Sequence, residues 1–246
     1  MKIVLQTLAV LIVGILFQPH ITKAEAPLWI GQINGTLLAS VGEPILKEAY
    51  KRIGKDITFI PAPSRRSLGA LNAGKLDGEM LRTERVAQIY PDIIKIDVPI
   101  FINGTYALTC HKDVSIKNME GLSKYKIGII KGLLSIEKRT EHLHPRPFAS
   151  YEAAFKLLAQ KKIDIIIAPL FHAAASIHKA RHENTVHILK PALHSTPLYH
   201  FVSQKNVDLV PDLTKTLQKM KNDGTIKLIV TKAFQKNGIT PPDDIF

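Results

Sequence analysis

Acidic and arginine side chains follow one another closely in the stretch KLDGEMLRTERVA, residues 75–87. A guanidinium offers a planar fork of donors that suits carboxylate or phosphate, and it stays charged when partly desolvated. Arg82 ends a short strand-like run and is the stronger candidate for contact with a ligand, with Arg85 as the weaker one. Glu79 could orient an arginine or accept a hydrogen bond from a ligand amine. A solvated salt bridge on the first turn of a helix is the alternative, above all for Glu84 and Arg85.

Two further kinds of side chain could contact a ligand. Arg66 follows the rigid turn PAP and comes near a predicted helix start. Aromatic rings can stack on a ligand held in a cleft, although packing in the core is the commoner role of any one ring. The aromatic candidates are Trp29, Phe101, Tyr106 and Tyr199, of which we retain Tyr106 as a binding residue.

Two pairs of histidines have the spacing of metal ligands. His142 and His144, and also His178 and His182, have spacings compatible with ligation of one metal, but no acidic residue nearby completes a set. Nucleophile elbows, phosphate-binding loops and zinc-protease motifs are absent from the sequence. We therefore expect neither a metal nor a cofactor.

The N-terminus has the layout of a secretory signal peptide. A basic start is followed by an apolar run over residues 3–17 and by the small-x-small triplet that ends at Ala26. A membrane anchor is the alternative, but the run is shorter than the ~20 residues of a spanning helix. Cys110 is the only cysteine, which excludes a disulfide within the chain. We expect cleavage after residues 1–26, a periplasmic location and no stable membrane insertion.

The formal net charge of +12 favours acidic partners. Its basic residues are spread along the chain and do not form a tract interleaved with aromatic residues, so we do not expect nucleic-acid binding. Anionic small molecules and anionic surfaces remain as the partners that this charge favours.

From residue 28 the pattern alternates between strands and helices, which predicts an α/β architecture with mainly parallel sheets. Gly54 and Gly74 are expected to end helices, Thr83 and Ser150 to cap helix starts, and Pro169 to occupy the first position of a helix. The Asn-Gly pairs at residues 34 and 103 are expected to form turns. Strands are expected over residues 28–33, 57–63, 76–81, 126–130 and 163–168, and helices over 44–53, 67–74, 133–143, 151–162, 169–181, 211–223 and 225–237.

Two extended segments, residues 104–113 and 197–206, break this rhythm. Each is long enough to run from one compact unit to another. We expect one lobe to comprise residues 27–107 with 198–246, and a second, inserted lobe to comprise residues 108–197. Two lobes joined by two strands can hinge shut on a ligand in the cleft between them.

Five segments within residues 28–236 look familiar together: AGKLDGEMLRTERV, VPIFINGTYALTCHKD, YKIGIIKGLLSIE, AFKLLAQKKIDIIIA and TPLYHFVSQKN with LQKMKNDGTIKLIVTKAF. In these segments the chain resembles the bacterial extracellular solute-binding proteins that serve polar amino acid uptake. The resemblance implies a type II periplasmic-binding-protein fold, in which two α/β lobes are joined by two hinge strands with a cleft between them.

The resemblance also implies binding residues. An arginine after a Thr-x-x-Arg stretch holds the ligand carboxylate in amino-acid binders, and here that position is Arg82 or Arg85, because the motif is shortened. Amides at a helix start add to this site, which implies Gly132, Leu133, Leu134 and Ser135, although the usual threonine is missing. An aspartate that receives the ligand ammonium is replaced here by Ala168 and Pro169, which speaks against an α-amino acid ligand.

The expected function is that of a monomeric periplasmic binding protein, not an enzyme. It would capture a small polar, anionic or zwitterionic, ligand and deliver it to an ABC transporter permease or a membrane sensor. Some relatives act as dehydratases on small carboxylic acids. That alternative would need Glu79 or Glu43 as the acid. A module that binds a sensor partner is the third interpretation.

Overall fold

The computed structural model describes residues 26–33, 37–179, 185–236 and 238–246. The predicted signal peptide, residues 1–26, lies outside this range except for Ala26. Asn34, His182 and the first Asn-Gly pair are outside it as well. In the described part, no helix has the length and apolar character needed to cross a membrane.

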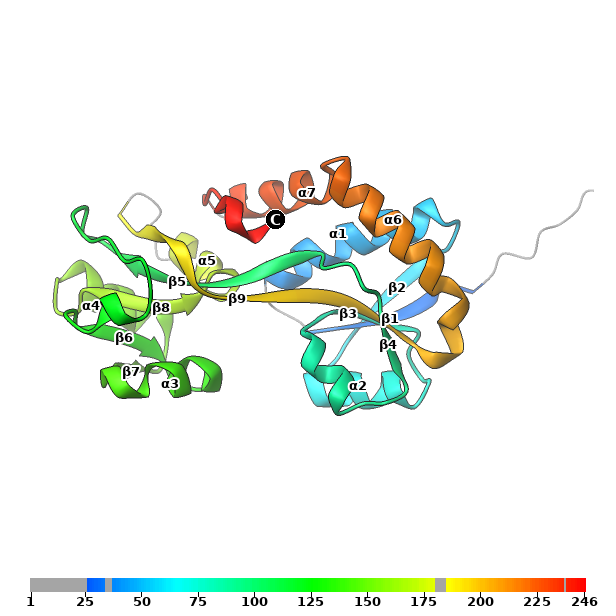
Figure 1. Cartoon of the computed structure of the whole chain (residues 1–246), viewed down its shortest axis with the longest axis horizontal. Coiled ribbons are helices and arrows are strands. Elements are labelled where there is room, and N and C mark those ends of the chain that lie inside the picture. Colours follow the sequence, from blue (N-terminus) through cyan, green and yellow to red (C-terminus); the bar gives the residue numbers. More distant parts are fainter. Residues whose placement is uncertain (1–25, 34–36, 180–184, 237) are drawn as a thin grey trace, which may run out of the picture.

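One run of paired strands crosses the whole molecule, in the order β2-β1-β3-β9-β5-β8-β6-β7, and β4 pairs with β9 (Figure 1). β1 is parallel to β2 and β3, and β6 is parallel to β7 and β8, whereas β9 is antiparallel to β3, β4 and β5. The α/β prediction is confirmed, but the sheet is mixed rather than mainly parallel. The strands are β1 Leu28–Gln32, β2 Ile57–Pro61, β3 Gly78–Arg82, β4 Ile93–Lys95, β5 Phe101–Thr109, β6 Ile127–Ile130, β7 Arg146–Phe148, β8 Ile165–Pro169 and β9 His187–Ser203.

Two long antiparallel strands connect the two ends of this sheet. β5 and β9 pair from Phe101 opposite Leu198 to Thr109 opposite His187. In Figure 1 they run side by side from one part of the molecule into the other. We call β1–β4 with the C-terminal end of β9 the first lobe, and β6–β8 with the adjoining ends of β5 and β9 the second lobe. The lobe boundaries expected after residues 107 and 197 stay predictions.

Helices of the first lobe bury one apolar face each. In α1, Leu37–Arg52, this face includes Val41, Ile45, Ala49 and Tyr50. Burial of each large apolar side chain contributes about 1.5–3 kcal/mol, which outweighs the weak helix propensity of the valine and isoleucine. Gly54 ends the segment at a φ of 70°, as the sequence predicts. The other helices of this lobe are α2 Ser64–Asn72, α6 Val210–Asn222 and α7 Thr225–Gln235.

The second lobe places α3 Leu134–Thr140, α4 Tyr151–Ala159 and α5 Leu170–Lys179 around its strands. The Oγ atom of Ser150 accepts a hydrogen bond from the Ala153 N–H at 3.3 Å, so the predicted cap of α4 is confirmed. β8 is buried from Ile165 to Ala168, as expected for a continuous apolar strand covered on both faces.

Four predicted details are wrong. α1 extends back to Leu37 with Pro44 inside it, because the apolar face continues through Val41 and offsets the missing proline N–H. Pro169 is the last residue of β8, and α5 begins one residue later. Thr83 precedes a 3₁₀ helix rather than an α-helix, and its side chain makes no capping hydrogen bond. Asn103 and the two residues after it lie inside β5 and not in a turn.

Short 3₁₀ helices complete the connections. The C-terminal one packs against β5, and its Ile245 is fully buried. The 3₁₀ helices are η1 Glu84–Gln88, η2 Glu120–Leu122, η3 Glu141–Leu143, η4 Gln204–Leu209 and η5 Asp243–Ile245.

Candidate functional site

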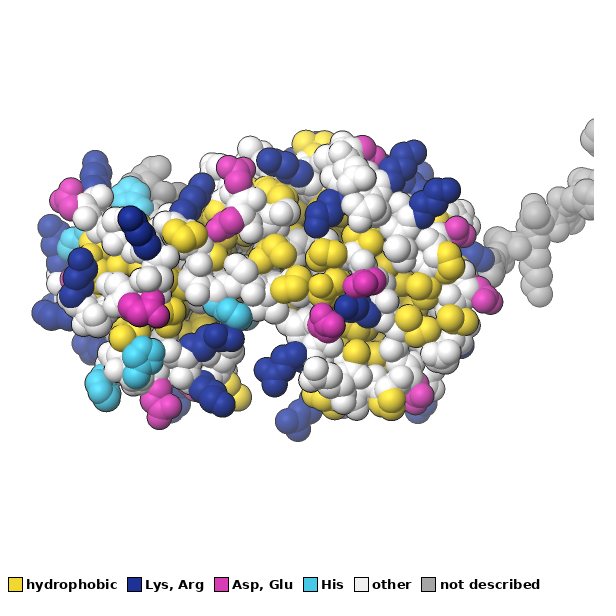
Figure 2. All heavy atoms as spheres, viewed as in Figure 1, with side chains coloured by type: hydrophobic (Ala, Val, Ile, Leu, Met, Phe, Trp, Pro, Cys, Tyr) yellow, Lys and Arg dark blue, Asp and Glu magenta, His cyan; other side chains and the backbone are white. Residues whose placement is uncertain are grey.

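A cavity of about 660 Å³ lies between the two lobes. Figure 2 shows a notch at this place, with Lys and Arg side chains on both sides of it. The volume falls in the range of small-molecule sites. The residues that line it are Thr83, Arg85, Asn103, Thr105, Gly132, Leu133, Leu134, Ser135, Ile136, Arg139, Pro169, His194, Ser195, Thr196 and Pro197.

The walls of the cavity come from segments far apart in the sequence. Thr83 and Arg85 follow the end of β3 in the first lobe, whereas residues 132–136 follow β6 in the second lobe. Pro169 stands at the carboxyl end of β8, which is parallel to β6. The carboxyl ends of neighbouring parallel strands form the crevice in which α/β folds bind ligands. The middle of β5 and of β9 lies between the lobes and closes the cavity on a third side.

Several predicted site residues lie together in this cavity: Arg85, Gly132, Leu133, Leu134, Ser135 and Pro169. α3 has only 7 residues. The N–H of Gly132 donates to Oε1 of Glu137 at 2.7 Å, so this amide already has an acceptor within the protein. The N–H of Leu133 also donates, to the carbonyl oxygen of Ile130 at 3.4 Å. The expectation that the amides at this helix start are available is therefore wrong for Gly132 and Leu133. Ligand contact by these residues stays a prediction.

Glu79 and Arg82 lie in the interior of the first lobe and not on the cavity wall. Glu79 is fully buried and Arg82 is 8% exposed. Their side chains form an ion pair, and the hydroxyl of Ser67 donates to the second carboxylate oxygen of Glu79. Of the two arginines, Arg85 and not Arg82 lines the cavity in this structure, and which of them contacts a ligand stays a prediction.

Burial opposes the charge on both members of this pair. Desolvation raises the pKa of the Glu79 carboxyl, and the charge of Arg82 counteracts part of that rise. Desolvation likewise lowers the pKa of Arg82, against the effect of Glu79. A guanidinium still remains protonated, so the pair holds a permanent positive charge that only Glu79 neutralises. The pair is buried and does not line the cavity, so it is not placed to contact a substrate there.

The remaining two predicted residues also lie elsewhere. Tyr106 is fully buried, and its hydroxyl donates to Oδ1 of Asp244 near the C-terminus. Burial is the main cause that raises the pKa of Tyr106, followed by this hydrogen bond. Arg66 is exposed on α2 and does not line the cavity. Of the other aromatic candidates, Trp29 is exposed on β1, and Phe101 and Tyr199 are buried in the core.

Sequence reasoning missed the polar residues that the linking strands and α3 bring to the cavity. Asn103 and Thr105 lie on β5, opposite Thr196 and His194 on β9. Oδ1 of Asn103 is buried and has no hydrogen-bond partner among the described residues. Thr105, near the start of the extended segment 104–113, was the available signal, because a fully buried strand would be apolar throughout. Asn103 was expected in a turn, and residues 194–196 lie before the second extended segment.

Positive charge dominates this cavity. Arg139 of α3 lowers the pKa of His194, second to the effect of partial burial. The Nε2 atom of His194 is 3.1 Å from Oγ1 of Thr196. Raising the local negative charge, for example with a bound anion, would favour the protonated form of His194.

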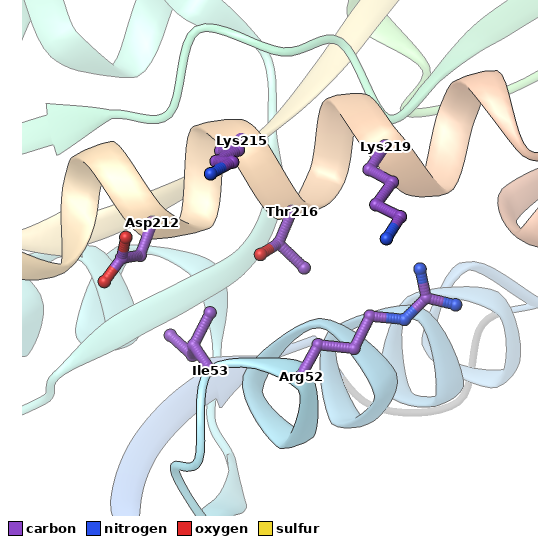
Figure 3. A pocket seen from close by; sticks show the side chains of 6 residues that line it. All are labelled: Arg52, Ile53, Asp212, Lys215, Thr216 and Lys219. Carbon is purple, nitrogen blue, oxygen red and sulfur yellow. The ribbon is translucent and has the colours of Figure 1, made fainter.

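A second cavity, of about 470 Å³, lies between the end of α1 and the outer face of α6. Figure 3 shows its lining side chains: Arg52, Ile53, Asp212, Lys215, Thr216 and Lys219. Arg52 is already bound to Glu48 at 2.8 Å and to Asp223 at 3.1 Å. All residues that line this second cavity belong to the first lobe, so closure of the two lobes cannot enclose a ligand there. Across residues 26–33, 37–179, 185–236 and 238–246, no three His, Cys, Asp or Glu side chains are grouped as metal ligands.

No protein-family model and no curated protein sequence matches this chain. Solved structures do match it over most of its length. The ligand-binding core of GluR0 in complex with L-glutamate is 14% identical, with a TM-score of 0.63, over 86% of this chain and 99% of that one. An ancestral arginine-binding protein bound to arginine is 22% identical, with a TM-score of 0.58, over the same shares.

The probable amino-acid ABC transporter extracellular-binding protein ytmK from Bacillus subtilis is 17% identical, with a TM-score of 0.62, over 85% of this chain and 98% of that one. The chain has the type II periplasmic-binding-protein fold. This confirms the fold expected from the resemblance. At these identities the likeness concerns the fold, and the ligand has to be argued from the cavity.

Proposed function

We propose that this protein is an exported solute-binding protein that traps a small polar, anionic or zwitterionic, molecule between its two lobes. The observation that carries the proposal is the cavity between the lobes, with walls from both lobes and from both linking strands. Such a cavity can be closed by a hinge motion of β5 and β9, which encloses the ligand and removes water. Closure therefore couples ligand binding to a change in shape that a membrane partner can detect.

The remaining parts of the proposal concern organisation and partners. Residues 1–26 act as a cleaved signal peptide, and the monomeric protein works in the periplasm. Its lobes comprise residues 27–107 with 198–246, and residues 108–197. An ABC transporter receives the ligand. A membrane sensor is the alternative partner. The ABC assignment is supported by the likeness to the Bacillus subtilis protein ytmK, a probable extracellular-binding protein of an amino-acid ABC transporter.

An enzyme would need an acid or base that reaches the cavity. Glu79 is buried in its ion pair with Arg82, and Glu43 lies on α1 beside Lys47, at 4.0 Å. Neither residue lines the cavity. The three solved structures named above are described as binding proteins or a ligand-binding core. We therefore do not propose the dehydratase alternative.

A ligand screen tests the proposal. Purified protein is assayed by thermal shift against a library of small polar solutes, and each hit is followed by small-angle X-ray scattering. We expect at least one solute to raise the melting temperature and to reduce the radius of gyration. Ser195→Trp, which fills the cavity from an exposed position on β9, should abolish both effects. The matched control Ser123→Trp, exposed after η2 and outside the lining, should leave both unchanged. Absence of any hit, or hits without compaction, would contradict the proposal.

A further inference from the structure

The two lobes each present an arginine to the cavity. Arg85 comes from η1 in the first lobe, and Arg139 from α3 in the second lobe. Both side chains are exposed, and neither has an ion pair or a hydrogen bond with a residue that the structure describes. Two unpaired guanidinium groups on different walls can each take up one acidic group of a ligand in a bidentate manner. His194, on β9 and close enough to Arg139 for their charges to interact, adds a third basic group.

Negative charge is missing from the same walls. Among the described residues that line the cavity, none is Asp or Glu. Two carboxylates that are close along the chain have other partners, and neither lines the cavity. Glu137 accepts from the Gly132 N–H at 2.7 Å, and Glu84 pairs with Lys95 at 3.3 Å. β8 ends with Ala168 and Pro169, so this strand end carries no acidic residue either.

A zwitterionic amino acid does not fit this distribution of charge. Its ammonium group would lose water on closure without gaining a carboxylate, and it would face Arg139 or Arg85 across the cavity. A ligand with an acidic group at each end has the opposite property, because each acidic group meets a guanidinium and none of its atoms is cationic. The hydroxyl groups of Thr83, Thr105, Ser195 and Thr196 can donate to the remaining carboxylate oxygens.

We propose that the ligand is a small dicarboxylate without an ammonium group, bound by Arg85 at one end and by Arg139 at the other. This rests on the proposed function, since it assumes that the cavity between the lobes binds a solute. The dianion bridges the lobes, so it favours the closed form by binding a guanidinium from each of them. His194 becomes protonated beside the bound anion and contributes a further contact.

Titration calorimetry at pH 7 tests the proposal with succinate and glutarate as probes. Butyrate carries one acidic group, L-glutamate adds an ammonium group, and inorganic phosphate places its charge at a single point. We expect a dicarboxylate to bind at least tenfold more tightly than butyrate, L-glutamate or phosphate. Arg85→Gln and Arg139→Gln should each weaken dicarboxylate binding at least tenfold. Lys138→Gln is the matched control, because it makes the same change in charge on an exposed neighbour of Arg139 that does not line the cavity.

The outcomes separate this inference from the function on which it rests. Tight binding of an amino acid, or of phosphate, with no dicarboxylate binding would overturn the inference and leave a solute-binding protein. Dicarboxylate binding that one of the two arginine variants does not weaken would overturn the bridging arrangement. If no solute of the library binds, the proposed function fails together with the inference. Circular dichroism melts of each variant check that loss of binding is not loss of folding.

Discussion

Replacing Glu79 with glutamine, or Arg82 with methionine, removes one member of a buried ion pair and leaves the other without its counter-charge. Glu79 is fully buried and Arg82 is 8% exposed, so water reaches neither group well enough to compensate. Breaking a buried pair from one side destabilises a protein by about 3–5 kcal/mol. We expect both variants to lose free energy of unfolding in this range at pH 8.

The two variants should respond differently to acid. In Glu79→Gln the unpaired group is Arg82, whose guanidinium does not release its proton. The variant also lacks the carboxyl whose raised pKa makes the native protein more stable at low pH, so the loss should be larger at pH 5 than at pH 8. In Arg82→Met the unpaired group is Glu79, and its pKa, which burial already raises, rises further without the arginine. When the pKa of a carboxyl is higher in the folded than in the unfolded state, the protein loses stability as the pH rises towards the folded-state pKa. Arg82→Met should therefore be less destabilised at pH 5 than at pH 8.

Urea unfolding followed by far-UV circular dichroism measures these differences against the native protein at each pH. Glu48→Gln serves as the control, because it makes the same chemical change in the more exposed pair with Arg52, where the loss should stay below about 1 kcal/mol. If both variants changed the free energy of unfolding by less than about 1 kcal/mol at pH 8, the pair would not be buried. Arg82 would then be free to reach the cleft.

Three further predictions follow from buried groups. Full burial lowers the pKa of His200 from 6.5 to about 4, so its contribution to stability is complete above pH 6.5 and is lost as the pH falls towards 4. Between pH 7 and pH 4, the free energy of unfolding of the native protein should therefore fall by about 3 kcal/mol more than that of His200→Gln, as measured by urea unfolding. Tyr106→Phe removes the hydroxyl that donates to Asp244 and should destabilise the protein by about 1–2 kcal/mol. The buried hydroxyl of Tyr151 has no hydrogen-bond partner among the described residues, so Tyr151→Phe should not destabilise the protein. Gly31→Ala would place a Cβ atom against Ser67 and Glu79 and should destabilise the protein by about 1–3 kcal/mol in thermal melts. The control Gly69→Ala adds a Cβ atom on α2 that contacts no other atom, so it should not destabilise the protein.

Local patterns were enough to predict most helices and strands. Ser150 before an apolar periodic run predicted the start of α4, and Gly224, at a φ of 79°, predicted the break between α6 and α7. These signals work because caps and left-handed glycines depend on neighbouring residues alone. Pro44 misled the prediction of α1, since the sequence could not tell that burial of Leu37 and Val41 would sustain the helix before it.

Contacts between distant strands could not be predicted in this way. The sequence indicated extended segments around residues 104–113 and 197–206, and both lie wholly or partly in β5 and β9. Their register, with Thr105 opposite His194 and a shift before Ala107, depends on pairing over a long sequence separation. Without the register, nothing in the sequence placed His194 or Ser195 beside residues 132–136 in one cavity.

The pairing of Glu79 with Arg82 has a specific backbone cause. Side chains alternate between the faces of a regular strand, so residues three apart should point in opposite directions. Between these two residues the register shifts: Glu79 lies opposite Phe201 and Arg82 opposite Tyr199, so two residues of β3 face the single residue His200. This bulge inverts the alternation and brings Arg82 to the face of Glu79.

The same bulge explains how the buried polar groups support the cavity. A bulge leaves backbone groups of the longer strand without ladder partners. Nδ1 of His200 lies 2.8 Å from the carbonyl oxygen of Glu79, an acceptor, so Nδ1 carries the proton; Nε2 then accepts from the hydroxyl of Tyr50 at 2.8 Å. His200 and the ion pair hold the C-terminal end of β3, and Thr83 and Arg85 follow directly after this strand. The charged cluster thus divides into a buried pair, Glu79 and Arg82, and one arginine, Arg85, that lines the cavity between the lobes. Loosening the buried part should weaken ligand binding through Arg85, and Glu79→Gln and Arg85→Gln should then be less than additive in their effects on affinity.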